Sequence, residues 1–190
     1  MRLDFSKDVL DAMTTLKAGG ATTKWLVRTF FIDKFSQVFP DYRDRVVRHE
    51  AGHFLLGYLV GVPVTGYSLE LGREHTEFAE AKIQARIIER TLTDDEIDSL
   101  ALMAVAGIAA EGQMYEEIMG QTADLFDLQR LLLRSKTRLS DQQQQNITRW
   151  AVYSAASLLR TYKKEHVALI EAMSRGAKVA DCVRAIESAV

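Results

Sequence analysis

The chain has little cysteine and little proline. Its 190 residues include a single cysteine, Cys182, and two prolines. One cysteine excludes an intrachain disulfide and fits a reducing compartment, and we expect Cys182 to pack within a helix. No stretch rich in proline, glycine or serine separates two parts of the chain, so its length and composition predict one compact domain.

An excess of either charge is also missing, as are long apolar runs. The 24 Lys and Arg residues nearly balance the 26 Asp and Glu residues, which disfavours a nucleic-acid surface or a polybasic membrane arm. The longest apolar run, residues 54–64, is much shorter than the ~20 residues of a membrane-spanning helix. The first residues do not form a signal peptide. We therefore expect a soluble protein with no membrane span and no nucleic-acid partner.

Histidine is scarce as well, yet two of the four histidines belong to one His-Glu-x-x-His string. The string lies in a predicted helix of residues 43–60. On a helix, His49 and His53 share one face about a turn apart, so both imidazoles can reach one metal ion. Glu50 can reach a water bound to that metal. The string predicts Zn2+ bound by His49 and His53, with Glu50 as the catalytic base.

A third ligand is needed, because a catalytic zinc site normally takes three protein ligands and keeps a fourth position for water. His75 lies in a predicted polar turn and His166 on a late helix among charged residues, so we expect both to face solvent. Three carboxylates then remain as candidates: Glu111, Asp124 and Asp127.

The residue patterns around the motif helix predict further helices and a small β part. Residues 6–18 and 23–38 carry helical spacing and should pack across the domain, with a membrane-surface helix as the alternative. Residues 64–71 suit a strand. Residues 81–87 alternate between apolar and polar, which favours an edge strand or hairpin arm over a helix. An extended peptide can bind such an edge by adding a strand to it.

The second half of the chain is predicted to be helical. A capping-box pattern at Thr93, with a glutamate three residues later, starts a helix that runs to Gly120 and carries Glu111 on its apolar stripe. A carboxylate on that stripe needs a partner. Residues 122–127 form a short connector, and helix follows through residue 187. Later breaks are expected near Ser140 and Gly176.

Three separated strings follow one another: His-Glu-Ala-Gly-His at residues 49–53, Gly-Ile-Ala-Ala-Glu at 107–111, and Gly-Gln-Thr-Ala-Asp-Leu-Phe-Asp-Leu at 120–128. Their order resembles the protease domain of FtsH-type zinc metalloproteases. In that family a Gly-x-x-Ala-Glu string precedes a Thr-Gly-Ala-Ser-Asn-Asp-Leu string whose Asp is the third zinc ligand. Thr122 and Asp127 keep the same offset as that Thr and Asp.

The resemblance therefore implies Asp127 as the third zinc ligand, ahead of Asp124. It also implies a mainly α (α+β) fold, a helical zincin-like protease domain with a small β-hairpin or short sheet beside the motif helix. Glu111 would accept a hydrogen bond from a ligating histidine. Its alternative is a structural role, paired with an arginine or a backbone amide.

The chain departs from that family in several places. Residues 123–126 replace the Gly-Ala-Ser-Asn of the family, so the segment presenting Asp127 has less glycine. Phe54 replaces a small residue after the motif. A Walker A string and an ATPase domain are absent, as are the membrane-spanning segments of that family. We expect a free-standing protease domain over residues 41–190, with a helical extension over residues 1–40 packed on it.

These observations predict a zinc-dependent endopeptidase that hydrolyses peptides or unfolded proteins without an ATPase of its own. One alternative is a non-cutting assembly or scaffold protein that keeps the FtsH protease fold, and another is the proteolytic subunit of a machine with a separate ATPase. A structural zinc module is disfavoured by the single cysteine. By resemblance we expect a homo-oligomer such as a hexamer, located in the cytoplasm or, in a plant, the chloroplast stroma.

Overall fold

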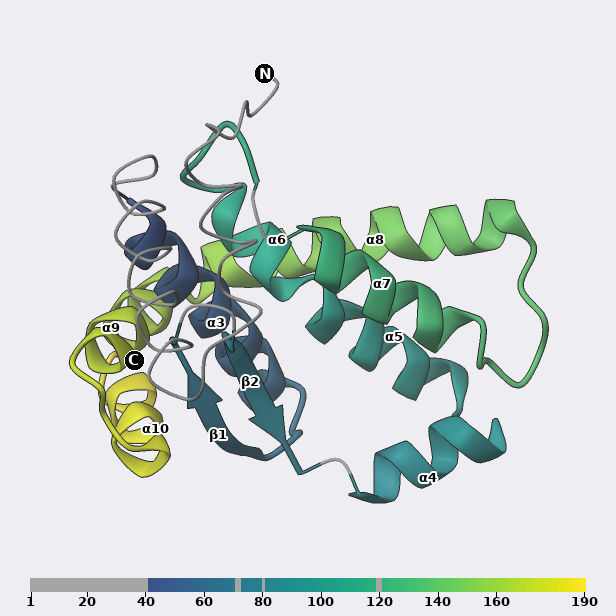
Figure 1. The fold of residues 1–190 in the computed structure, drawn as a ribbon, viewed down its shortest axis with the longest axis horizontal. Helices are drawn as coiled ribbons and strands as arrows, with labels where there is room; N and C mark the ends of the chain where they lie inside the picture. Colours follow the sequence, from purple (N-terminus) through teal and green to yellow (C-terminus); the bar gives the residue numbers. More distant parts are fainter. Residues whose placement is uncertain (1–40, 71–72, 80, 119–120) are drawn as a thin grey trace, which may run out of the picture. The chain divides into compact units, whose positions relative to one another are not determined.

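The computed structural model describes residues 41–70, 73–79, 81–118 and 121–190. The two helices predicted within residues 1–40 lie outside these ranges. The described residues form a mainly α-helical fold with one two-stranded antiparallel sheet (Figure 1), which confirms the predicted fold class. The strands are β1 (Val64–Ser68) and β2 (His75–Phe78). The helices are α3 (Tyr42–Leu59), α4 (Ala81–Glu89), α5 (Asp94–Ala104), α6 (Ala106–Glu111), α7 (Gln121–Leu132), α8 (Asp141–Thr161), α9 (Lys163–Ser174) and α10 (Val179–Glu187).

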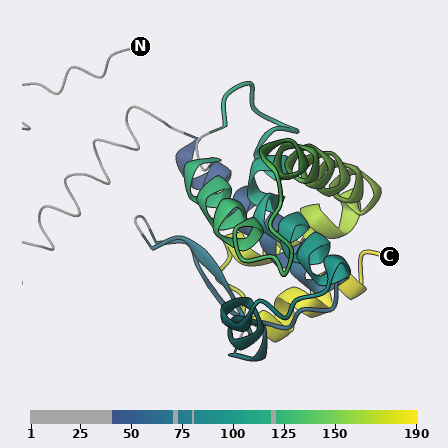
Figure 2. The same ribbon diagram turned by 90° about the vertical axis from the view of Figure 1, so that its right-hand side faces the viewer.

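Helix α3 carries the motif, as predicted, and contributes a continuous set of side chains to the core. Ala51, Phe54, Leu55 and Leu56 on α3 are fully buried. Figures 1 and 2 show α5, α7 and α8 on one side of this helix and α9 with α10 on the other. Core packing therefore fixes the position of the motif helix, and with it the backbone that carries the two histidines.

The sheet differs from the prediction in its second strand. β1 forms within the predicted segment 64–71 and pairs with β2, from Val64 opposite Phe78 to Ser68 opposite His75. Residues 81–87 form helix α4 instead of the expected strand. Ile83 and Ile87 are four residues apart, a spacing that fits a helix as well as a strand. The lysine, glutamine and arginine between the apolar residues favour the helix because they lose little side-chain freedom there.

The long helix predicted from Thr93 to Gly120 is divided in the structure. Its start is confirmed, because Thr93 and Glu96 form the capping box that begins α5. The helix breaks at Val105, and α6 ends at Glu111. The connector comes earlier than predicted: residues 112–118 form no regular element, while residues 122–127 belong to α7.

Both later breaks are confirmed. Ser140 caps α8 in a capping box with Gln143, and Gly176 adopts a positive φ of 71° between α9 and α10. Among residues 41–70, 73–79, 81–118 and 121–190, no helix combines the length and the apolar character that a bilayer crossing requires.

Candidate metal centre

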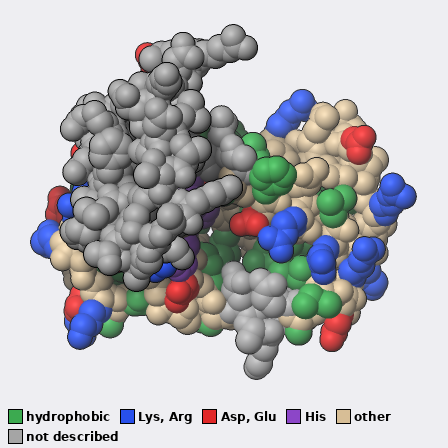
Figure 3. Space-filling view, in the orientation of Figure 1, with side chains coloured by type: hydrophobic (Ala, Val, Ile, Leu, Met, Phe, Trp, Pro, Cys, Tyr) green, Lys and Arg blue, Asp and Glu red, His purple; other side chains and the backbone are tan. Residues whose placement is uncertain are grey.

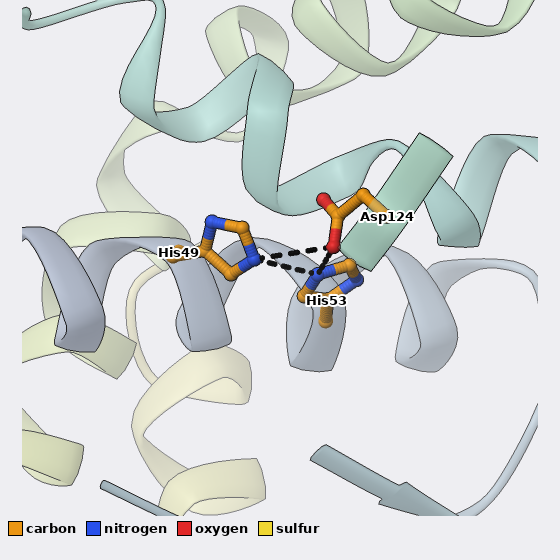
Figure 4. A group of neighbouring side chains, drawn as sticks. All are labelled: His49, His53 and Asp124. Carbon is orange, nitrogen blue, oxygen red and sulfur yellow. Dashed lines mark hydrogen bonds and ion pairs between the residues drawn. The ribbon is translucent and has the colours of Figure 1, made fainter. Parts of the chain in front are cut away.

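Three side chains from two helices meet at one point. His49 and His53 project from the same face of α3, and Asp124 projects toward them from the first turn of α7 (Figure 4). The two Nε2 atoms are 3.1 Å apart, and Asp124 Oδ1 lies 3.4 Å from each of them. The exposed fractions of the three side chains are 12%, 14% and 8%, so the cluster is largely shielded from water.

The hydrogen bonds of the two Nδ1 atoms determine the protonation of the two Nε2 atoms, which face Asp124. His53 Nδ1 lies 2.8 Å from the Met103 carbonyl oxygen. A carbonyl only accepts, so this Nδ1 carries the proton, and in the neutral ring Nε2 presents a lone pair. His49 Nδ1 donates in the same way to Glu111 Oε1 at 2.7 Å. Two nitrogen lone pairs and a carboxylate oxygen therefore converge, and only a cation or protons can hold them together.

Glu111 lies at the place expected for a partner of the motif helix. It is 2% exposed, and its second oxygen, Oε2, lies 4.0 Å from Arg45 Nη1. The Arg45 guanidinium also stacks 3.8 Å from the centre of the Tyr115 ring. Both contacts considered for Glu111 from the sequence are thus present: it accepts from a motif histidine and it lies beside an arginine.

The spacing of the three inner atoms fits a small divalent ion. An ion bound tetrahedrally at about 2.0 to 2.1 Å keeps its ligand atoms about 3.3 to 3.4 Å apart. The observed separations are 3.1, 3.4 and 3.4 Å. Imidazole and carboxylate ligands suit zinc, but several other divalent metals accept the same set. The residues present therefore fit a metal ion without selecting zinc by geometry alone.

The electrostatics of the cluster favour positive charge. Burial lowers the pKa of His49, but hydrogen bonds to Asp124 and Glu111 outweigh it and raise the pKa to about 10. Burial likewise lowers the pKa of His53, and the charge of Asp124 reverses the effect and raises it above its ordinary value. Burial raises the pKa of Asp124, yet the two histidines hold it below the ordinary range. Without a metal, the cluster binds protons in its place.

Two glycines let α6 approach α3 closely enough to complete the cluster. A Cβ on Gly107 would lie 2.2 Å from His49 Nε2, and a Cβ on Gly52 would lie 2.7 Å from the Ala106 carbonyl oxygen. Any side chain at residue 107 would therefore displace the His49 imidazole. From the same helix, the Ile108 N–H donates to Asp124 Oδ2 at 3.3 Å, so α6 also orients the carboxylate.

Asp124, not the predicted Asp127, is the carboxylate beside the histidines. The Asp127 side chain is 69% exposed and pairs with Arg130 at 3.4 Å. The expectation assumed that residues 122–127 form a connector. Because these residues are helical, Asp127 lies almost a turn further along α7, and only one of the two carboxylates can meet the histidines. Asp124 thus replaces Asp127 as the candidate third ligand.

A signal for this choice was present in the sequence. Asp124 shares helical spacing with residues that are buried in the structure, Leu128, Leu131 and Leu132. Asp127 instead falls in register with Arg130, on the polar face. Reading the segment as a helix would have assigned Asp124 to the inner face.

Glu50 lies next to the cluster, but its carboxylate is not among the three groups that converge. It is 4% exposed, and the Thr76 hydroxyl donates to its Oε2 at 2.8 Å. Thr76 belongs to β2, so the hairpin holds the carboxylate of the motif glutamate. This contact was missed because residues 75–78 carry no pattern typical of a strand.

The two remaining histidines lie outside the cluster. His75 is exposed, as expected, but on β2 instead of in a turn, where it contacts Glu77. His166 is buried, contrary to the prediction, and is 5% exposed. Burial and the charge of Arg48 lower the pKa of His166 to about 4. Among the described residues its Nε2 has no hydrogen-bond partner. Leu169 and Met173, three and seven residues later and also buried, mark the inner face on which it lies.

A cavity of about 620 Å³ opens beside the cluster. His49, Glu50, His53 and Asp124 line one part of it, and side chains of β2, α4, α5 and α7 form the rest of the wall. The cavity thus lies directly beside the point where the three side chains converge.

Comparisons with protein-family models, with curated proteins and with solved structures gave no match. The chemistry of the cluster must therefore be inferred from its own residues.

Proposed function

We propose that the chain is a metal-dependent peptidase in which His49, His53 and Asp124 hold a zinc ion and Glu50 transfers the proton. The observation that carries the proposal is the convergence of two Nε2 lone pairs and one carboxylate oxygen at ligand spacing. Their outer hydrogen bonds, from His49 to Glu111 and from His53 to Met103, fix both rings in the ligating tautomer.

The donor set supports a catalytic role over a structural one. Structural zinc sites are usually closed by four Cys or His ligands, whereas two histidines and one carboxylate leave a position open. That position would face the cavity that Glu50 also lines. The only cysteine, Cys182, is buried on α10 and takes no part in the cluster.

When bound, the ion would acidify a water molecule and polarise a peptide carbonyl. The chain's own residues supply the proton transfer. Thr76 donates to Oε2 of Glu50, which leaves Oε1 to accept a proton from water in the cavity and deliver it to the leaving amine. Glu111 and the Met103 carbonyl meanwhile keep the His49 and His53 rings from rotating.

The substrates proposed are peptides or locally unfolded chains. No Gly-x-x-x-x-Gly-Lys-Ser/Thr string is present in the sequence, so hydrolysis of a short peptide by the chain itself would not respond to ATP. Folded substrates would require a separate ATPase that unfolds them.

The test compares zinc content with cleavage in the native chain and in Glu50→Gln. Glu50 is not a ligand, so we expect Glu50→Gln to retain zinc and to lose cleavage of unfolded casein by several orders of magnitude. His53→Ala should lose both zinc and cleavage. Native protein that binds zinc but cuts neither casein nor short peptides would instead identify a non-cutting assembly protein, and equal cleavage by Glu50→Gln would refute the mechanism.

A further inference from the structure

Part of the wall of the cavity beside the cluster is apolar. Its wall there comes from β2, α4, α5 and α7. Eight apolar residues line it: Phe78, Ile87, Ile88, Leu100, Met103, Ala104, Ala123 and Leu131. Met103 also accepts the hydrogen bond of His53 through its carbonyl, so the apolar wall begins directly beside the cluster. A bulky apolar side chain of a bound peptide would be removed from water here.

Two arginines line the same cavity. Arg130 is on α7, and Arg134 is four residues later, on the turn that ends the helix. Arg130 is 80% exposed and pairs with Asp127, itself 69% exposed, at 3.4 Å. An exposed ion pair of this kind contributes little to stability, so Arg130 can leave Asp127 for another carboxylate. The Arg134 guanidinium contacts no hydrogen-bond or ion-pair partner within the part of the chain that the structure describes.

The surrounding chain strengthens the positive charge at this end of the cavity. Residues 128–140 include four basic residues and no acidic one. Figure 3 shows Lys and Arg side chains gathered over α7 and the loop that follows it, beside apolar side chains. The four basic residues are Arg130, Arg134, Lys136 and Arg138. Asp124 and Asp127 of α7 line the cavity as well, so a negatively charged group entering it would be attracted to the end at Arg134, beyond these carboxylates.

We propose that Arg130 and Arg134 bind a carboxylate of the substrate, so that the site prefers peptides with a bulky apolar residue at the scissile bond and a carboxylate further along the chain. A guanidinium presents two parallel N–H groups to a carboxylate, which makes arginine well suited to the task. The carboxylate belongs to an Asp or Glu side chain or to a free C-terminus. The inference rests on the proposed function, because it takes this cavity as the substrate site.

The length of α7 gives the distance between the two subsites. Arg130 follows Asp124 by six residues on α7, which corresponds to about 9 Å along a helix, and Arg134, in the turn after Leu132, lies about one helical turn further, at about 15 Å. An extended peptide advances about 3.3 Å per residue. The preferred carboxylate is therefore about three to five residues from the scissile bond.

The test uses zinc-loaded full-length chain and matched fluorogenic peptides with a central Leu-Phe pair. The first peptide carries Glu four residues from that pair and an amidated C-terminus, in versions with Glu on either side of the pair. The second carries Gln in place of Glu, and the third is the Gln peptide with a free C-terminal carboxylate at that distance. We expect kcat/KM to be about tenfold higher for a carboxylate peptide than for the amidated Gln peptide. The third peptide tells whether a C-terminal carboxylate serves as well as a side chain.

Arginine variants locate the preference. In Arg130→Gln/Arg134→Gln the carboxylate-to-amide ratio of kcat/KM should fall to about one. Arg138→Gln is the matched control, because Arg138 is basic and exposed in the same segment but lines a different cavity. That variant should keep the tenfold ratio. A ratio near one in the native chain, a ratio that survives the double variant, or an equal loss in Arg138→Gln would each overturn the inference.

Binding separates this inference from the peptidase assignment. Fluorescence anisotropy of the same peptides on zinc-loaded Glu50→Gln should show the same tenfold ratio, which Arg130→Gln/Arg134→Gln removes. If the native chain cuts none of the peptides but this binding ratio is present and depends on the two arginines, the carboxylate site stands and the peptidase assignment fails. If cleavage occurs without any carboxylate preference in rate or binding, the peptidase assignment stands and the arginine site fails.

Discussion

Buried histidines occur in two places in the molecule, and their pKa is raised in one place and lowered in the other. Burial lowers the pKa at both places, but hydrogen bonds to Asp124 and Glu111 raise that of His49 to about 10, whereas the charge of Arg48 helps lower that of His166 to about 4. The charged neighbours, not the burial, decide whether the pKa is raised or lowered. A buried histidine beside carboxylates favours binding of a proton or a metal cation. A buried histidine beside an arginine stays neutral and packs in the core.

The largest expected effect is on zinc affinity, and it concerns Asp124, the carboxylate beside His49 and His53 that His166 lacks. Asp124→Ala should weaken zinc binding by more than about 100-fold, since loss of a ligand should exceed the ~10–100-fold effect of losing an outer partner. Asp127→Ala, whose side chain is exposed on the same helix, should bind zinc like the native chain. A competitive titration against a zinc-chelating dye measures both, and zinc loss in Asp127→Ala alone would restore the ligand set expected from the FtsH resemblance.

The next effect concerns His166 and the stability of the fold. Its pKa is lowered to about 4 in the folded state by burial and by Arg48, against an ordinary value of about 6.5. The unfolded chain therefore binds the proton more readily, and the free energy of unfolding should fall by up to about 3 kcal/mol as pH drops from about 6.5 to 4. In the metal-free chain, the stabilisation from the raised pKa of His49 is fully present below about 6.5 and is lost only near pH 10, so it does not vary in this window.

Urea denaturation of metal-free native chain and of His166→Gln at several pH values between 4 and 7 measures the effect. The variant should lose most of the pH dependence in this window, while His75→Gln, which changes an exposed histidine, should keep it. Identical pH dependence in the native chain and His166→Gln would show that His166 does not stay neutral.

A smaller effect is expected at the outer partner of His49. Glu111→Ala removes the carboxylate that accepts from Nδ1 and should lower zinc affinity by about 10–100-fold without abolishing binding. Glu116→Ala, an exposed glutamate in the following loop, is the control and should leave the affinity unchanged. Complete loss of zinc in Glu111→Ala, with Asp124→Ala unaffected, would mean that Glu111 and not Asp124 is the ligand.

The parts of the fold that were predictable are those with strong local signals. The start of α5 follows from the Thr93 capping box, and two later breaks follow from Ser140 and Gly176. In each case the deciding interaction lies within a few residues of chain, so the sequence window contains it.

The parts that were missed depend on packing between distant residues. Strand β2 is short and polar and exists by pairing with β1, so its own residues gave no strand pattern. The position of Asp124 depends on α6, whose Ile108 N–H holds it, and on whether residues 122–127 are helical. His166 has charged neighbours in sequence, yet its helix turns it inward. Burial of a single polar residue is set by tertiary contacts that a local pattern does not contain.

The most direct test of the metal centre is anomalous diffraction at the zinc edge from crystals of the zinc-loaded chain. We predict one strong peak at about 2.0 to 2.2 Å from His49 Nε2, His53 Nε2 and a carboxylate oxygen of Asp124, with Asp127 still at the surface. A peak coordinated by Asp127 in place of Asp124, or no peak between the two histidines, would contradict the account.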